Sequence, residues 1–468
     1  MPPRCPLAAD GQGEAARDIL AKLYTKLADL NSEELDGIWA AIVKNYFMPL
    51  FVGQFDLVAG NPPWVIWDNL PAEYRDDTKP IWVRHGLFPH GGMDTILGKS
   101  KKDIAMLMTY EVADTLLVKD GRLGFVITQS VFKTSGSGQG FRRFHLGSKT
   151  PLQVVHVDDM VDFQPFEAAS NRTTVLILQK GRATKYPAPY TVWQKTARGE
   201  RIGFDLTLAE VSAMTRRLNY VAEPVGEDDL TTPWLTARPK VAKTVRKMLD
   251  SSDYEAHAGA YSGGANAVYW LQKIQDRRDG TVLVKNWTEG AKREADEVQA
   301  VLEGDYVFPL LRNSHVRRWK AESSGHILVV QDPEERKGID EEELQKACIQ
   351  TWKYLKNFEK LLRSRAAFKR YYTRKKNGRV EETAPFYSMF DVGTYTFSRY
   401  KVVWPNMGNR LDAAVVSELD GKPIVPQHIV SMVAVHTLDE GHYIAALINS
   451  TPFQFAAFSY SQAGGKSF

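Results

Sequence analysis

The stretch from Phe55 to Trp64 constrains the fold of this chain more than any other. The apolar run Phe55–Gly60 predicts a strand, and it leads directly into Asn61-Pro62-Pro63-Trp64. Proline cannot donate to a strand ladder, so the strand should end before Pro62. In open α/β sheets ligands bind at the carboxyl ends of the strands. The sequence therefore places an amide, two rigid residues and an indole where a ligand is expected.

Each residue of this loop suits the task of holding a flat base that carries an exocyclic amine. The side-chain oxygen of Asn61 can accept a hydrogen bond from one N–H of the amine, and the carbonyl of Pro62 can accept from the other. Pro62 and Pro63 remove two backbone donors and stiffen the turn. Trp64 offers a face for stacking, worth about 1–3 kcal/mol per base. The structural alternative is a plain turn with Trp64 in the core.

The string aliphatic-aliphatic-Gly-Asn-Pro-Pro-Trp resembles motif IV of the amino-group DNA methyltransferases. A motif that begins with Asn61 and ends with an aromatic residue is similar to that of the adenine-N6 branch of the family. The motif of the cytosine-N4 branch more often begins with serine. The segment Gly121–Ser130 resembles the strand after motif IV, although Thr128 stands where the family usually has a proline. Later segments resemble the target-recognition regions of type IIG restriction–modification enzymes and of BREX-type phage-defence methylases. They are Tyr261–Trp270, Phe308–Asn313, Leu355–Arg365, Gly393–Phe397, Lys401–Pro405 and Ala446–Ser450.

The resemblance implies a site-specific DNA methyltransferase that transfers a methyl group from S-adenosylmethionine to adenine N6. It further implies double-stranded DNA as the partner and a restriction–modification or phage-defence system as the setting. The catalytic residues it assigns are Asn61, Pro62, Pro63 and Trp64, with Asn61 also facing the cofactor. Adenine N6 lies inside the duplex, so the base must be flipped out before transfer.

The cofactor site should be incomplete in this sequence. The family places a glycine-rich loop and its acidic ribose partner before motif IV, and only sixty residues precede Asn61. They contain Gly11-Gln12-Gly13 with no strand before it to present a loop to the cofactor. We expect a fragment, or a split subunit whose cofactor-binding half is carried by a second polypeptide. Two alternatives stay open: a non-catalytic DNA-recognition subunit, and a methyltransferase of RNA or of protein glutamine.

Length and composition set the broad class of the chain. Its 468 residues exceed a single domain of about 100–200 residues. The contents of 43% hydrophobic and 25% charged residues are typical of globular proteins. No apolar run approaches the roughly 18 residues that span a bilayer. The two cysteines, Cys5 and Cys348, fit a reducing compartment, and no Cys/His spacing suits zinc. We expect a cytoplasmic protein with neither a metal nor a membrane partner.

The order of the apolar segments predicts the organisation of the fold. We expect an α/β class: a partial Rossmann-like methyltransferase sheet followed by an α+β target-recognition domain. The predicted parts are an N-terminal helical segment over 1–50, the C-terminal part of the catalytic domain over 51–195, and a DNA target-recognition domain over 230–468. Asn31-Ser32 and Asp103 should each cap a helix. Residues 65–102 should be irregular, and 154–157 and 174–178 should pair as an edge hairpin.

Two basic regions are candidates for DNA contact. One long helix is predicted from about Glu341, and its second half and the loop after it are basic and interleaved with aromatic residues. Charge runs are usually solvated faces, but this combination suits a phosphate backbone with nearby bases. The candidates in it are Lys360, Arg363, Lys369, Arg370, Arg374, Lys375 and Lys376. Beside the glycine-rich stretch 135–140, the candidates are Lys133, Arg142 and Arg143.

Overall fold

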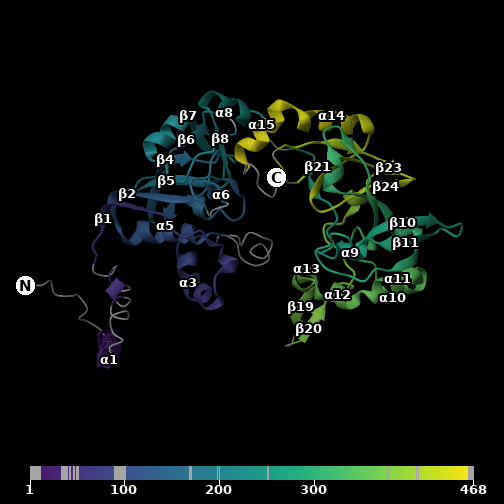
Figure 1. Cartoon of the computed structure of the whole chain (residues 1–468), viewed down its shortest axis with the longest axis horizontal. Helices are drawn as coiled ribbons and strands as arrows, with labels where there is room; N and C mark the ends of the chain where they lie inside the picture. Colours follow the sequence, from purple (N-terminus) through teal and green to yellow (C-terminus); the bar gives the residue numbers. More distant parts are fainter. Residues whose placement is uncertain are drawn as a thin grey trace, which may run out of the picture. The chain divides into compact units, whose positions relative to one another are not determined.

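The computed structural model describes most of the chain, which divides into two compact units (Figure 1). The described residues are 12–32, 52–88, 102–167, 171–197, 201–249, 252–376, 379–406 and 410–461, with 41, 44, 45, 48, 199 and 408 singly. The first unit comprises 1–131 and 139–219, and the second comprises 132–138 and 220–468. The architecture is mixed α/β, as predicted.

The first unit is built on a mixed sheet with the strand order β1-β2-β5-β4-β6. These strands are β1 (Phe55–Gly60), β2 (Leu117–Thr128), β5 (Thr173–Lys180), β4 (Thr150–Asp159) and β6 (Ala188–Lys195), and β3 (His145–Leu146) pairs with β4. β1 is parallel to β2 and β4 to β6, whereas β5 is antiparallel to both neighbours. The predicted pairing of 154–157 with 174–178 is confirmed, but the predicted edge position is wrong, because the two strands lie inside the sheet between β2 and β6. The carboxyl ends of β1, β2, β4 and β6 therefore meet at one edge.

Helix α5 (Ile104–Thr115) covers one face of this sheet and lies beneath β2 in Figure 1. Its predicted cap is confirmed, since the Asp103 carboxylate accepts a hydrogen bond from the Ala105 N–H at 3.0 Å. Leu123, Phe125 and Ile127 alternate along β2 and are all buried. This alternation makes a core between helix and sheet, and leaves the carboxyl edge of the sheet to the loops.

Two expectations for the first unit are wrong. Asn31 and Ser32 are the last residues of α1 (Gln12–Ser32) rather than the cap of a later helix, most of which lies outside the described residues. Residues 72–84, expected to be irregular, form α3 (Ala72–Arg84), because Pro71 precedes the helix instead of breaking it and Trp82 gives it a buried anchor. Residues 89–101 lie outside the described part. The short elements are η1 (Trp67–Asn69), η2 (Phe141–Arg143) and α7 (Leu208–Met214).

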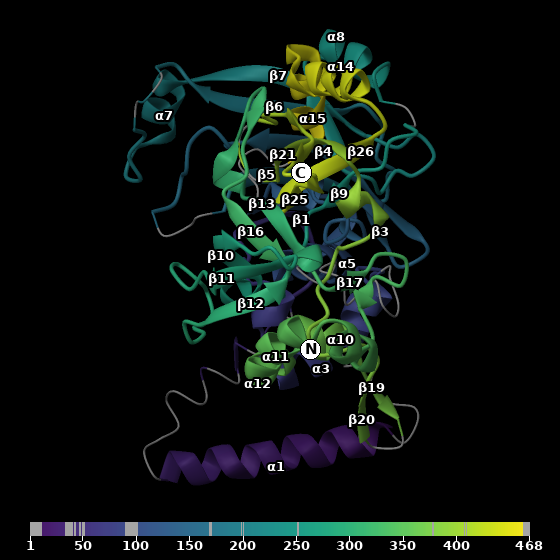
Figure 2. The same ribbon diagram turned by 90° about the vertical axis from the view of Figure 1, so that its right-hand side faces the viewer.

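The second unit contains two larger sheets, whose strands lie side by side in Figure 2. The six-stranded sheet has the order β12 (Gln299–Glu303), β11 (Thr281–Asn286), β10 (Trp270–Asp276), β16 (Gly325–Leu328), β13 (Val307–Leu311) and β25 (Val425–Pro426). The four-stranded sheet has the order β22 (Ala414–Val416), β21 (Tyr400–Pro405), β26 (Val430–Val435) and β9 (His257–Ala258). Antiparallel pairs join β7 (Thr215–Pro224) to β8 (Trp234–Ala237), β14 (Val316–Arg317) to β15 (Lys320–Ala321), β17 (Gln331–Asp332) to β18 (Lys337–Gly338), β19 (Thr373–Lys376) to β20 (Arg379–Glu382), and β23 (Glu418–Leu419) to β24 (Lys422–Pro423).

The long helix predicted from Glu341 is wrong, because four short helices replace it. They are α10 (Glu341–Ala347), α11 (Ile349–Asn357), α12 (Glu359–Ser364) and α13 (Ala366–Tyr371). The residues at the breaks, Cys348, Phe358 and Arg365, are all buried. All three side chains thus lie in the core at the points where one helix ends and the next begins. The other helices of the second unit are α6 (Ser130–Lys133), α8 (Pro239–Arg246), α9 (Asn266–Tyr269), η3 (Gly304–Tyr306), η4 (Asn313–His315), η5 (Thr394–Phe397), α14 (Leu438–Asn449) and α15 (Thr451–Tyr460).

Candidate functional site

The loop Asn61–Trp64 follows β1 directly and lies at the carboxyl edge of the first unit's sheet. Asn61 and Pro63 are exposed, Pro62 between them is buried, and Trp64 is half-buried. Glycine at position 60 lets the end of β1 lie close to the Phe125 ring of β2, because a Cβ there would lie 3.1 Å from that ring. The buried proline thus anchors the turn while the Asn61 amide faces outward.

Three hydrogen bonds fix the loop to its surroundings. The indole Nε1 of Trp64 donates to the carbonyl of Val126 in β2 at 3.2 Å. The carbonyl of Val65 accepts from Ile104 N at 2.9 Å, and Trp67 N donates to the Lys102 carbonyl at 2.7 Å. The Trp64 and Phe166 rings pack in a T-shaped arrangement, with the ring centroids 5.8 Å apart. These contacts hold the indole in place and leave part of its surface exposed, so the loop is preorganised.

Burial perturbs two ionisable groups behind the loop. It lowers the pKa of Lys102 to about 8, against an opposing contribution from the Asp68 carboxylate. It raises the pKa of Asp103 to about 6, against the hydrogen bond from Ala105 N. Lys102 and Asp103 support the loop through their backbones and cap α5, so these shifts follow from their positions in the fold.

A buried polar cluster lies at the same sheet edge, after the ends of β2 and β4. Gln129 Nε2 donates to Asp159 Oδ2 at 2.7 Å, and the Tyr190 hydroxyl donates to the same carboxylate oxygen. Burial and the Asp159 charge together raise the pKa of Tyr190 well above its ordinary value. The sequence analysis missed this cluster. The local signal was that Asp159 is the last residue of β4 and Gln129 the first residue after β2.

Thr128 occupies the position where the resemblance led us to expect proline. Its hydroxyl lies 2.7 Å from that of Ser130, at the start of α6. Thr128 is buried and ends β2, three residues beyond Phe125, which pairs with Gly60. A hydroxyl pair therefore stands at this point in place of a rigid ring.

Lys133 and Arg142 are placed in the interior. Lys133 Nζ donates to the carbonyls of Trp234 and Ser459, at 3.0 and 2.7 Å, and to Thr236 Oγ1 at 2.6 Å. Arg142 is 1% exposed and donates through Nη1 to the Val131 carbonyl at 2.6 Å. The structure speaks against the phosphate contact expected for these two residues, because buried cations that already bind carbonyls present no charge to a surface.

Arg143, the third candidate beside the glycine-rich stretch, is exposed. The Arg143 guanidinium packs directly against Gly86, because a Cβ at position 86 would lie only 1.6 Å from Arg143 Nη1. Gly86 has φ +65°, which favours glycine for a second reason. Arg143 therefore remains a candidate for phosphate contact, in a position fixed by the glycine beneath it.

The basic run of the second unit divides into paired and unpaired cations. Arg363 binds the carboxylates of Glu359 and Glu382, and Arg374 binds that of Glu381 at 2.9 Å. Four exposed members form no ion pair with any described residue: Lys360, Lys369, Arg370 and Lys376. The side chain of Lys375 lies outside the described residues. We call those four residues the basic patch, and they carry the remaining expectation of phosphate contact there.

The aromatic residues expected to stack on bases beside this run are mostly inside. Phe368 is buried, and the Tyr372 hydroxyl donates to the carbonyls of Arg336 and Met389. Tyr371 is 37% exposed and lies next to the Arg370 guanidinium, which is 5.7 Å from the ring centroid. Tyr371 is thus the member of the three that faces solvent.

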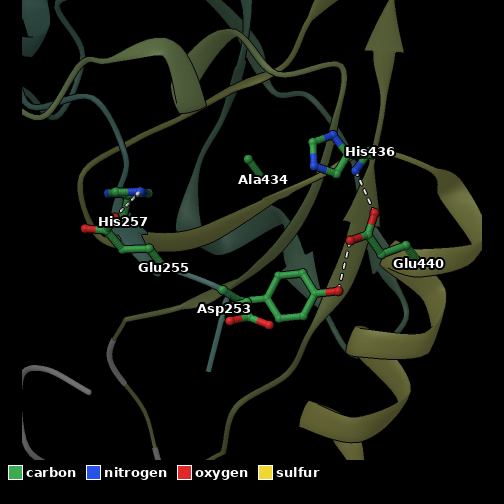
Figure 3. Close-up of a pocket in the computed structure, with 7 residues that line it drawn as sticks. Asp253, Glu255, His257, Ala434, His436 and Glu440 are labelled. Carbon is green, nitrogen blue, oxygen red and sulfur yellow. Dashed lines mark hydrogen bonds and ion pairs between the residues drawn. The ribbon is translucent and has the colours of Figure 1, made fainter. Parts of the chain in front are cut away.

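A separate pocket of about 350 Å³ lies in the second unit and has an acidic lining (Figure 3). Its carboxylates come from Asp253, Glu255 and Glu440, and Glu440 accepts from the His436 N–H and the Tyr254 hydroxyl. This chemistry disfavours a phosphate. Within the described residues, no group of three or more His, Cys, Asp or Glu side chains is arranged to hold a metal ion. None of the described helices is both long and apolar enough to cross a membrane.

The described residues fit S-adenosylmethionine only in part. Asn61 offers a polar group at the sheet edge where the family binds its cofactor. β1 has β2 on one side, and its other edge pairs with no strand of the described residues. No glycine loop with an acidic partner stands beside Asn61 in the described part of the chain.

The sheet and its loop define a class: the chain resembles the methyltransferases of restriction–modification systems. Residues 11–163 match the family of the Eco57I restriction-modification methylase. The chain is 21% identical over 450 residues to the Type II methyltransferase M.NspV of Nostoc sp., a match that covers 94% of this chain and 79% of that protein.

Two solved structures show a more distant likeness. The Type IIL restriction-modification enzyme MmeI, in complex with DNA, has a TM-score of 0.44 at 9% identity, covering 84% of this chain and 42% of that one. The type IIG restriction endonuclease BpuSI has a TM-score of 0.29 at 14% identity, covering 90% and 46%. The chain spans less than half the length of either.

Proposed function

We propose that this chain forms the target-base and DNA-recognition parts of a DNA methyltransferase that modifies adenine N6, with S-adenosylmethionine as methyl donor. The observation that carries the proposal is the Asn61–Trp64 loop at the carboxyl edge of the sheet, with the Asn61 amide exposed and the turn anchored by Pro62. The family match over 11–163, which contains this loop, supports it. We assign the protein to a restriction–modification or phage-defence system.

The loop can bind and orient the amine of a flipped adenine. Asn61 Oδ1 and the Pro62 carbonyl accept the two N6 hydrogens, which draws the nitrogen lone pair out of conjugation with the ring. Trp64 stacks on the base with the part of its ring that is not covered. The cofactor, when bound, supplies an electrophilic methyl group. The protein contributes orientation, and no strong base is needed because the proton leaves after transfer.

One feature of the molecule favours a nucleic acid over a protein substrate. The exposed cations of the basic patch complement a polyanion, whereas a protein glutamine needs no such surface. RNA shares this charge, so the two nucleic acids must be separated by experiment. A second candidate function is DNA recognition without catalysis, because one edge of β1 pairs with no strand of the described residues. We propose that any missing part of the cofactor pocket comes from residues outside those described or from a second polypeptide.

The test is Asn61→Ala in the full-length protein, expressed with its neighbouring genes in a host that lacks DNA methylation. We expect N6-methyladenine in the host DNA, measured by mass spectrometry, to fall by about 100-fold or more, a loss typical of one transition-state contact. DNA affinity should stay within about twofold, since Asn61 acts on the flipped base and not on the phosphates. Asn69→Ala serves as the matched control, because Asn69 is another exposed asparagine of the same unit and lies outside the loop.

Three outcomes count against the proposal. Full adenine methylation by Asn61→Ala would remove Asn61 from the catalytic site. Methylated cytosine, RNA or glutamine in place of methylated adenine would change the substrate. A wild-type chain that binds DNA but methylates nothing in this setting would support the non-catalytic alternative.

A further inference from the structure

A tryptophan is displayed at the tip of a small hairpin in the second unit. β14 and β15 pair Val316 with Ala321 and Arg317 with Lys320, so the turn consists of only Arg318 and Trp319. The Trp319 side chain is 54% exposed, whereas the other tryptophans of the described residues are buried or half-buried. A large apolar ring at a hairpin tip contributes little to a core. Its exposure calls for a reason outside the fold.

The backbone at Trp319 is strained. Its φ is +70°, at the turn position for which glycine or asparagine is normally selected. A bulky side chain in this region is a true outlier. A sequence chosen for the turn alone would place glycine here. The indole is therefore retained against the local conformational preference.

The surrounding structure holds this strained turn in one conformation. Trp319 N donates to the Ala413 carbonyl at 2.9 Å, and Arg318 Nη2 donates to the Asn449 carbonyl at 2.9 Å. The Asn449 side chain binds both the N–H and the carbonyl of Ala413, at 2.9 and 2.8 Å. Val316, at the base of the hairpin, is 1% exposed. All of these contacts use backbone atoms or other side chains, so the indole is rigidly presented without being needed for its own support.

The charge around the indole is positive. Arg317, Arg318 and Lys320 are exposed, and the Arg318 guanidinium lies 5.5 Å from the Trp319 ring centroid. Lys320 pairs with Glu322, the one acidic residue of this stretch, at 2.8 Å. The tip therefore combines an aromatic face with an excess of cations, which complements a nucleobase flanked by phosphates.

We propose that Trp319 is a nucleobase contact of the DNA-binding surface. Its indole stacks on, or inserts beside, a base that is partly unstacked, while Arg317 contacts an adjacent phosphate and Arg318 holds the turn through the Asn449 carbonyl. The proposal rests on the proposed function insofar as DNA is the ligand. It adds a site outside the Asn61 loop and the basic patch, with a readout that needs no methyl transfer.

The experiment compares DNA binding by full-length Trp319→Gly and Trp319→Phe with the wild type. The probe is a fluorescent 30-base-pair duplex, with or without one central unpaired adenine, titrated by anisotropy. Trp319→Gly should weaken binding by about tenfold, and more on the probe with the unpaired base, because stacking is lost. Trp319→Phe keeps an aromatic face and should stay within about threefold. Tyr443→Ala, which removes another exposed aromatic ring of the same unit, should leave affinity unchanged.

Stability and salt dependence separate this role from a structural one. Trp319→Gly suits φ +70° and should keep or raise the melting temperature. The salt slope of binding should be unchanged in Trp319→Gly, since no charge is lost, and should fall by about 1 in Arg317→Gln. Unchanged affinity in Trp319→Gly, or a large drop in its melting temperature, would overturn the inference while leaving the proposed function intact. A wild type that binds neither duplex would count against DNA as the substrate itself.

Discussion

At the scale of single residues, the candidate site depends on the different roles of Gly60, Asn61, Pro62 and Trp64. Pro62 is buried and fixes the turn, whereas Asn61 before it is exposed and free to meet a ligand. Gly60 leaves room for the Phe125 ring, because a Cβ at position 60 would lie only 3.1 Å from that ring. Trp64 binds the Val126 carbonyl through its only polar atom. The packing of these neighbours therefore holds the amide of Asn61 in position, and in the proposed reaction Pro62 and Trp64 also contact the base through the Pro62 carbonyl and the indole face.

Lys401 gives a pH-dependent prediction at the same scale. It is completely buried in β21, where Nζ donates to the carbonyls of Ser398 and Ile424, and burial lowers its pKa to about 7 against a weaker opposing contribution from Glu418. The unfolded chain has the ordinary lysine pKa of about 10.5 and so binds more protons between pH 7 and 10.5. Stability from this group is therefore full above the unfolded pKa and is lost as the pH falls toward 7. The slope is at most about 1.4 kcal/mol per pH unit.

Chemical denaturation at pH 7.5, 8.5 and 9.5 measures this effect. The free energy of unfolding of the wild type should rise with pH relative to Lys401→Met, which cannot titrate. Lys346→Met is the matched control, because Lys346 is 79% exposed and should show no such difference. Parallel pH curves for wild type and Lys401→Met would show that the buried amine does not carry the dependence.

At the scale of elements, local patterns predicted strands better than helix lengths. The strand before Asn61, the Asp103 cap and the β4–β5 pairing follow from apolar runs and capping residues that lie close in sequence. The prediction of one long basic helix is wrong because residues distant in sequence interrupt it. The Glu303 carboxylate of β12 accepts hydrogen bonds from Gln350 N and Thr351 N, so a new helix, α11, begins there. Arg365 likewise turns inward to donate to Ser262 and Phe386 carbonyls. Such partners cannot be read from a helical periodicity.

The short helices α12 and α13 also make a prediction about DNA binding. Lys369 and Arg370 of the basic patch are exposed and form no ion pair with a described residue, so both are available to phosphates. The double variant Lys369→Gln/Arg370→Gln should reduce the salt slope of DNA binding by about 2, close to 0.9 per contact. Arg374→Gln is the control in the neighbouring strand, because Arg374 already pairs with Glu381 and should change the slope by less than about 0.5. Fluorescence anisotropy between 50 and 300 mM salt, at about equal spacing in log concentration, gives both slopes. Equal slopes for the double variant and the wild type would place the DNA elsewhere.

At the scale of the whole molecule, the chain crosses between its two units more than once. Residues 132–138 belong to the second unit although the residues on both sides belong to the first. The Phe132 ring stacks on Trp234 with centroids 4.5 Å apart, and Lys133 Nζ reaches the Ser459 carbonyl across 326 positions of sequence. This separation is why Lys133 looked like a surface cation in the sequence. The interior position of its charge is fixed by the last helix of the described chain.

Lys133 lies in the segment 132–138 and is expected to stabilise the second unit. Lys133→Met keeps the length of the side chain but leaves the carbonyls of Trp234 and Ser459 and the hydroxyl of Thr236 without this donor. We expect a loss of about 2–4 kcal/mol in the free energy of unfolding, since buried acceptors would lose their partner. Hydrogen exchange should show the loss in β8 and α15.

Lys119→Met, at an exposed position of β2, should change stability by less than about 0.5 kcal/mol. The salt slope of DNA binding should stay that of the wild type at temperatures where the variant is folded. A stable Lys133→Met with a reduced salt slope would instead return Lys133 to the DNA-binding surface.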